Sequence, residues 1–222
     1  MTVTLSPARR GAVPAYRSKD ARPLLNIADR DGKPILSYYY GEPDPRWKLP
    51  ITSFIHPLIG LDGETLTDLM PADHLHHRGV FRAWVRHQRG EQSVGDWWHP
   101  SEMRAVDGAC SADDGPVFSR LVARSRWIHE RKGESPLPIM REYVVSRVFA
   151  TTPEGRAIDI DISLTALLDD FRFGGTLEKG KGYGGLTFRY GPATDIRIDA
   201  DGKHIEKDLN QLRAAWADWS GR

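Results

Sequence analysis

Four of the eight histidines in the chain lie between His56 and His77, and three of these four fall within four positions. These three stand in the segment Asp73-His74-Leu75-His76-His77-Arg78-Gly79. If the segment is extended, alternation places His74, His76 and Arg78 on one face. Asp73 and His77 then point to the other face. Successive side chains on one face are about 7 Å apart, so two imidazoles could converge on one ligand.

This pattern is compatible with two kinds of chemistry. A His-x-His pair on a strand is a common half-site for a metal ion, because neutral imidazole nitrogen suits Zn, Fe, Cu or Ni. His74 and His76 would then need a third ligand, either His56 or a distant Glu. Alternatively, one imidazole moves a proton near neutral pH while Asp73 fixes the tautomer of its neighbour. The residues alone leave both interpretations open.

A purely structural role is the competing interpretation. The imidazoles would then hydrogen-bond to backbone carbonyls and shape a turn, with Arg78 paired to a carboxylate and Gly79 at a positive φ. We favour a functional role, because clustered imidazoles repel one another when charged and need a compensating reason. The remaining histidines are isolated in the sequence. Surface or packing roles are expected for His87, His99, His129 and His204.

Two further segments supply candidate substrate-binding residues. Trp97 and Trp98 lie in a Gly- and Pro-bounded loop, 95–100, where an indole face could stack on a sugar ring or fill the core instead. The glycine-rich segment 180–189 matches neither Gly-x-Gly-x-x-Gly nor the Gly-Lys-Ser/Thr ending of a phosphate-binding loop. We interpret it as a turn that enters a strand. It carries Tyr183 and Arg189 either toward a pocket or into a surface ion pair.

The elements that must position these residues are predicted to be strands. Residues 158–168 alternate between apolar and polar positions, which is typical of a strand with one wet face. Residues 140–151 precede it, and residues 152–155 supply turn chemistry, so an antiparallel hairpin is expected. A third long strand is expected at 117–130. Shorter extended segments are expected at 24–28, 35–40, 52–59, 80–87, 186–190 and 196–198.

Frequent strands separated by turn residues predict an all-β fold, namely an antiparallel β-sandwich. Only Ile205–Trp216 has apolar residues at helical spacing, and one helix is expected there. Residues 1–20, with scattered Arg, Pro and Ser, are expected to form a loose N-terminal arm. Residues 21–222 are expected to form one domain, because no linker, repeat or abrupt change of composition divides them.

Composition excludes several classes of protein. The chain has 31 Lys and Arg against 30 Asp and Glu, and a formal charge of +1 gives no field for holding nucleic acid or an anionic membrane. No apolar run approaches the roughly 20 residues of a membrane span, and residues 1–18 do not resemble a signal peptide. A cytoplasmic location is therefore expected. The single cysteine, Cys110, allows neither an internal disulfide nor a thiolate metal cluster.

Taken in order, segments 73–79, 96–98 and 183–189 resemble a bacterial family catalogued as methane oxygenase PmoA domains, and the resemblance extends over residues 30–221. Upstream, segment 55–58 is similar to the family's Arg-Pro-aromatic-x-x-Pro approach, although Ser53 stands where a Pro would be expected. The resemblance implies a β-supersandwich like that of galactose mutarotase and a role in sugar catabolism. His74, His76 and His77 would then be the acid, base or metal ligands of a sugar-directed site.

Members of that family extend beyond the segment that resembles 216–221, whereas this chain ends at Arg222. The resemblance therefore implies a sandwich that is incomplete at its C-terminal side. An unfinished sheet leaves an open edge, and an open edge favours a homodimer.

Three functions follow as expectations. The first is a carbohydrate-directed enzyme that transfers protons at a sugar or keto-sugar ring, as an epimerase, lyase or hydrolase does. Its catalytic groups would be Asp73, His74, His76, His77 and Arg78. Its small-molecule carbohydrate would be bound by His56, Trp97, Trp98, Tyr183 and Arg189. The second is an enzyme with a divalent metal cofactor held by His56, His74 and His76. The third is a non-catalytic carbohydrate-binding protein.

Overall fold

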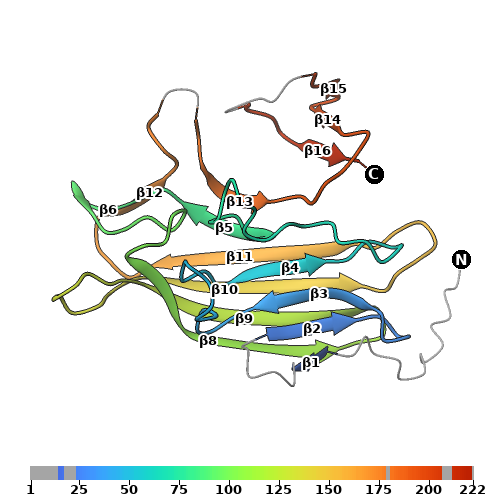
Figure 1. Ribbon diagram of the computed structural model, residues 1–222, viewed down its shortest axis with the longest axis horizontal. Helices are drawn as coiled ribbons and strands as arrows, with labels where there is room; N and C mark the ends of the chain where they lie inside the picture. The colour runs from blue at the N-terminus through green and yellow to red at the C-terminus, as the bar shows by residue number, and fades with distance from the viewer. Residues whose placement is uncertain (1–14, 18–23, 179–180, 207–211, 222) are drawn as a thin grey trace, which may run out of the picture.

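The computed structural model of the protein describes residues 15–17, 24–178, 181–206 and 212–221 (Figure 1). Within these residues every paired strand is antiparallel and no helix is present. The all-β prediction is therefore confirmed. The same part of the chain contains no helix of the length and apolarity that crossing a membrane requires.

Two larger sheets build the body of the protein. The first has six strands in the order β1-β2-β3-β4-β5-β13. Their bounds are β1 Ala15–Arg17, β2 Leu24–Ala28, β3 Pro34–Tyr39, β4 Phe54–Leu58, β5 Val80–Trp84 and β13 Gly184–Phe188. The second has four strands in the order β11-β10-β9-β8. Their bounds are β8 Met103–Asp114, β9 Phe118–His129, β10 Leu137–Phe149 and β11 Ile158–Ala166.

The long strands of the second sheet separate a core face from a solvent face. On β9, Leu121 and Ala123 are buried, whereas their outer neighbours Arg120 and Arg124 are exposed. The buried side packs against the first sheet in one cluster, to which the first sheet contributes Leu25, Ile27, Ile35, Leu36, Tyr38, Ile55 and Val80. The two sheets are thus the two layers of an antiparallel sandwich, as the sequence predicts.

The predicted hairpin at 140–168 is also confirmed. Strands β10 and β11 pair over nine positions, with Met140 opposite Ala166 and Val148 opposite Ile158. A bridge between Thr152 and Gly155 closes the turn that joins them. The apolar residues of β11 are only partly buried, because β11 is the outermost strand of its sheet.

Two smaller sheets complete the described chain. One has the order β12-β6-β7, with bounds β6 Arg86–Arg89, β7 Gln92–Ser93 and β12 Phe171–Gly174. The other has the order β15-β14-β16, with bounds β14 Arg197–Ala200, β15 Lys203–His204 and β16 Ala217–Ser220. Trp219 of β16 stacks on Tyr190, with 3.6 Å between the ring centroids. This contact joins the C-terminal sheet to the segment after β13, at the upper right of Figure 1.

Two local predictions need correction. The helix expected at Ile205–Trp216 is not seen in residues 205, 206 and 212–216, and its middle, 207–211, lies outside the described residues. Its start follows the β14–β15 hairpin, where Ile205 N donates to Ile198 O at 2.9 Å. Of the expected N-terminal arm, Ala15–Arg17 pairs with β2 and so belongs to the first sheet. The rest of that arm lies outside the described residues.

A buried ion pair crosses the sandwich. Arg82 of β5 pairs with Glu142 of β10, and both side chains are almost fully buried. Arg82 Nη2 donates to the Tyr38 hydroxyl at 3.1 Å, and Ser125 Oγ donates to Glu142 at 3.0 Å. Burial raises the pKa of Tyr38 to about 12, so its hydroxyl stays protonated. The network satisfies both charges inside the core, which is the condition for tolerating them there.

His87 has the packing role that was expected for it. Its side chain is 0% exposed and its ring lies among Trp127, Phe171 and Phe173. Burial lowers the pKa of His87 to about 4, because a charged imidazole would lose its hydration in this apolar surrounding.

We expect His87 to make the protein acid-labile. Its pKa in the folded state lies below the ordinary value of 6.5, so the unfolded chain binds more protons between these two values. Stability is therefore complete above about pH 6.5 and falls toward pH 4, by about 3 kcal/mol from this residue. Urea unfolding at about pH 7.5 and about pH 4.5 measures the loss. A His87→Phe variant should have a clearly smaller pH dependence, and an unchanged dependence would contradict this role.

Candidate functional site

The segment that carries the three histidines is a pair of turns between β4 and β5, and it is not extended. His74 N donates to Pro71 O at 2.9 Å, and His77 N donates to His74 O at 2.9 Å. Gly79 ends the segment at a φ of 54°, where an added Cβ would lie 2.0 Å from Ile55 O. A glycine is required there. The expected alternation of the side chains between two faces is therefore wrong.

The turns nevertheless bring the imidazole rings together. His74 stacks on His77 with 4.6 Å between ring centroids, and His76 lies 4.5 Å from His77. His99, from the loop that follows β7, lies 4.4 Å from His76. We refer to His74, His76, His77 and His99 as the histidine cluster. The isolated surface role expected for His99 is therefore wrong.

A carboxylate orients each of the two exposed imidazoles. Asp73 accepts a hydrogen bond from His74 Nδ1 at 2.7 Å, and Asp96 accepts one from His99 Nδ1 at 3.0 Å. The hydrogen bond from His74 lowers the pKa of Asp73, so the Asp73 carboxylate is ionised at neutral pH. Because Nδ1 is the donor in both pairs, Nε2 is left as the nitrogen with the free lone pair.

The two inner imidazoles are uncharged at neutral pH. Burial lowers the pKa of His76 to about 3, with a further contribution from His77 and the other neighbouring cations. Burial and the neighbouring His74 lower the pKa of His77 to about 4. A neutral imidazole offers one N–H donor and one acceptor nitrogen. The histidine cluster can therefore donate and accept hydrogen bonds without carrying net positive charge.

Aromatic side chains border the histidine cluster on one side. The Trp98 ring lies 5.9 Å from His76 and 5.7 Å from His77. Tyr183 stacks on Trp98 at 5.5 Å with an angle of 13° between the rings, and it is 40% exposed. The Nζ atom of Lys181 lies over the Tyr183 ring, 5.9 Å from its centroid. Trp98 itself is only 6% exposed and belongs to the core, so Tyr183 is the ring of this pair that reaches the surface.

Trp97 and Arg78 do not reach the surface of the site. Trp97 is 1% exposed and packs on Trp127 at 5.1 Å, so it belongs to the core and does not bind a substrate. Arg78 is 0% exposed; it donates to His76 O at 2.9 Å and its guanidinium lies 4.5 Å from the Phe81 ring. Arg78 therefore stabilises the backbone of the histidine segment from the core side. The catalytic role predicted for it is wrong, because a buried guanidinium cannot touch a substrate.

Arg189 and His56 lie at the margin of the site. Arg189 Nη2 is 3.4 Å from Asp73 Oδ1 and its Nε is 3.9 Å from Asp68, so it forms the surface ion pair considered above. His56 Nδ1 is 3.0 Å from Thr67 Oγ1. Among the described residues no ring contact joins His56 to the histidine cluster. The expected metal set of His56, His74 and His76 is therefore not assembled.

Comparison with protein families gives one match. A family of unknown function, DUF6807, matches residues 28–222. The chain belongs to this family. No curated protein and no solved structure matches it. The match covers both layers of the sandwich from β3 onward and every residue of the histidine cluster.

In this DUF6807 chain the described residues contain no three His, Cys, Asp or Glu side chains placed to hold a metal ion. Within the histidine cluster the rings meet both face to face and edge to face, with 80° between the planes of His76 and His77. His74 and His77, in contrast, are nearly parallel, with 9° between their planes. The cluster as arranged is suited to hydrogen bonding and proton transfer.

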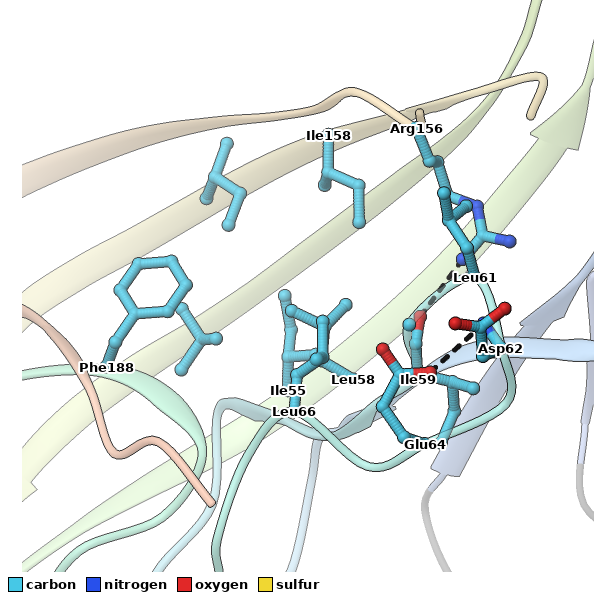
Figure 2. A pocket seen from close by; sticks show the side chains of 13 residues that line it. Ile55, Leu58, Ile59, Leu61, Asp62, Glu64, Leu66, Arg156, Ile158 and Phe188 are labelled. Atoms are coloured by element: carbon cyan, nitrogen blue, oxygen red, sulfur yellow. Dashed lines mark hydrogen bonds between the residues drawn. The ribbon is translucent and has the colours of Figure 1, made fainter. Parts of the chain in front are cut away.

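A cavity of the DUF6807 chain lies away from the histidine cluster, between β4 and β11 (Figure 2). Its volume is about 550 Å³, and Phe188 lies at one end and Arg156 at the other. Arg156 Nη1 donates to Ile59 O at 3.0 Å. The wall between them is apolar, formed by Ile55, Leu58, Leu66, Val80, Ile158 and Ile160. None of the four clustered histidines lines this cavity; the side chains of His74 and His99 are instead 47% and 54% exposed.

Proposed function

We propose that this protein is a carbohydrate-directed enzyme that transfers protons at a sugar or keto-sugar ring, with the histidine cluster as its reacting groups. One observation supports this proposal above the others. Two imidazoles that are oriented by carboxylates, His74 and His99, flank the uncharged pair His76 and His77 on an open surface. A base held by a carboxylate beside neutral hydrogen-bonding groups is the common arrangement for general acid–base catalysis.

The proton path follows from the free nitrogens. His74 Nε2 removes a proton from an anomeric hydroxyl, or from the carbon beside a keto group, and the bonding electron pair stays on the substrate. His99, after taking a proton from solvent at Nε2, returns one proton to the ring oxygen or to the same carbon. One proton is taken and one is returned, and solvent resets both imidazoles. His76 and His77 hold the substrate oxygens by hydrogen bonds.

Two features favour a sugar as the substrate class. Tyr183, which is 40% exposed and stacks on the buried Trp98 beside the imidazoles, offers an aromatic face, and such faces stack on the apolar sides of sugar rings. The resemblance of segments 73–79, 96–98 and 183–189 to PmoA-labelled domains supports the same class.

Hydrogen exchange tests the proposal without knowledge of the exact sugar. A panel of aldoses, ketoses and keto-sugars is incubated with the protein in deuterium oxide and followed by proton NMR. We expect at least one sugar to exchange a ring proton, or to interconvert its anomers, faster than in buffer. A sugar that binds without any exchange would support a non-catalytic carbohydrate-binding protein instead. A panel that neither binds nor reacts would contradict the proposal.

A metal-dependent enzyme is the second candidate, and the ring spacing favours it. Imidazoles that bind one ion at about 2.1 Å have ring centroids roughly 5 Å apart. Neighbouring rings of the histidine cluster are 4.4 to 5.7 Å apart, which is close to this spacing. The carboxylates on Nδ1 of His74 and His99 match the second-shell contacts of metal-bound histidines.

Metal analysis of protein purified without an affinity tag separates the two candidates. One equivalent of zinc, copper, nickel or iron, lost in a His76→Ala variant and kept in a His204→Ala variant, would establish the second candidate. His204 is a suitable control because it is another exposed histidine beside an aspartate, 3.6 Å from Asp199. Less than about a tenth of an equivalent would leave the acid–base candidate.

A further inference from the structure

A second concave surface lies on the opposite layer of the sandwich, on the solvent face of the β8–β11 sheet. Its volume is about 540 Å³. Because Leu121 and Ala123 of β9 point into the core, the alternate residues Arg124 and Arg126 point outward. The histidine cluster takes no part in this surface. We call it the outer hollow, and the side chains used below are Asp107, Ala109, Arg124, Arg126, Arg141, Tyr143, Ser163 and Thr165.

Strand register fixes how these side chains face one another. Across β9, β10 and β11, one row consists of Arg126, Arg141 and Thr165, and the next row consists of Arg124, Tyr143 and Ser163. Ala109 of β8 stands opposite Arg124, so a small side chain leaves room beside this guanidinium. Three cations, an aromatic ring and two hydroxyls therefore border one hollow.

The charges of the outer hollow are only partly balanced. Arg126 Nε donates to Asp107 at 2.6 Å, and this carboxylate is the partner of Arg126. Among the described residues no carboxylate forms an ion pair with Arg124 or Arg141. The carboxylate of Glu142 is buried in the core and paired with Arg82. Like charges at directly opposite positions of a sheet, such as Arg126 and Arg141, are destabilising unless an anion lies between them.

We propose that the outer hollow binds an anionic sugar through its carboxylate or phosphoryl group. The planar guanidiniums of Arg124 and Arg141 bind either oxyanion in the bidentate manner that arginine favours. Tyr143 is 45% exposed and offers a ring on which a sugar can stack. Ser163 and Thr165 supply hydroxyls for the sugar hydroxyls. The hollow is the size of one or two sugar units, and the near-zero net charge of the chain disfavours a long polyanion.

Calorimetric titration at low salt tests this assignment with three probes: glucuronate, glucose phosphate and uncharged glucose. We expect one of the two anions to bind, and glucose to bind at least tenfold more weakly. Tighter binding of glucuronate would show that the outer hollow prefers a carboxylate. Tighter binding of glucose phosphate would show that it prefers a phosphoryl group. Replacing Arg124 or Arg141 with Gln should weaken the anion about tenfold or more.

The matched control is Arg120→Gln. Arg120 lies on the same face of β9, outside the outer hollow, and pairs with Asp113 at 3.5 Å. The Arg120→Gln variant should bind the anion with the wild-type affinity. Thermal unfolding checks that each variant is folded. Three results would each overturn the assignment. Glucose and both anions could bind equally, or none of the three could bind. The folded Arg124→Gln and Arg141→Gln variants could also keep full affinity for the anion. Because the histidine cluster is not involved, His74 variants should bind these anions normally, whatever their catalytic activity.

Discussion

A His74→Gln variant is expected to exchange the sugar proton at least about 100-fold more slowly than the wild type, because a positioned general base contributes about this much or more. Glutamine keeps a hydrogen-bonding group near Asp73 but has no nitrogen able to accept a proton. The rate is measured by proton NMR in deuterium oxide with the sugar that the wild-type protein exchanges. Substrate affinity should change much less than the rate, because His76, His77 and Tyr183 remain in place.

Two variants control this experiment. His204→Gln alters another exposed histidine with an aspartate neighbour, and it should keep the wild-type rate. Asp73→Asn leaves the His74 ring present but removes the carboxylate that holds its Nδ1 proton, so an intermediate loss is expected. A His74→Gln protein that is folded and exchanges the sugar at the wild-type rate would show that His74 is not the base.

Glu142→Ala is expected to lower the free energy of unfolding by about 3–5 kcal/mol, which is the largest effect on stability that we predict. The variant leaves the charged guanidinium of Arg82 in the core, where the Tyr38 hydroxyl is the polar side-chain partner that remains among the described residues. It also removes the acceptor of Ser125 Oγ. Urea unfolding followed by tryptophan fluorescence measures the change.

The companion variants identify the cause of that loss. A double variant, Arg82→Met with Glu142→Leu, removes both charges and should recover much of the lost stability. Glu134 is exposed in the loop between β9 and β10, and Glu134→Ala should have little effect. If Glu142→Ala cost less than about 1 kcal/mol, the ion pair would not be a main determinant of the sandwich.

Most of the fold could be predicted from the sequence, because successive side chains of a strand point to opposite faces and apolar and polar residues therefore alternate. Residues 158–166 alternate strictly, and the strand and its hairpin partner form where expected. The helix expected at 205–216 rested on four apolar positions alone. Ile205 instead bonds through its backbone to Ile198, so local pairing between strands decides the conformation there. Spacing over one segment cannot reveal such a partner.

The candidate site was predicted only in part, because its geometry depends on turns and on residues distant in sequence. The density of histidines at 74–77 pointed correctly to a cluster of imidazoles. The turn that stacks them could not be read from an alternating pattern. His99 was missed, although an aspartate three positions before it was a usable signal for an oriented imidazole. Arg78 was predicted to be catalytic because the residues around it in the sequence do not reveal that its side chain is buried beneath a turn.

Imidazole NMR spectra of histidine-labelled protein test the central claim most directly, by following each ring while the reactive sugar is added. If the histidine cluster is the reacting site, the signals of His74, His76, His77 and His99 should shift together as the sugar saturates the protein. Those of His87, His129 and His204 should stay in place. A sugar that is turned over while none of the four cluster signals moves would contradict the account, because the chemistry would then take place elsewhere on the protein.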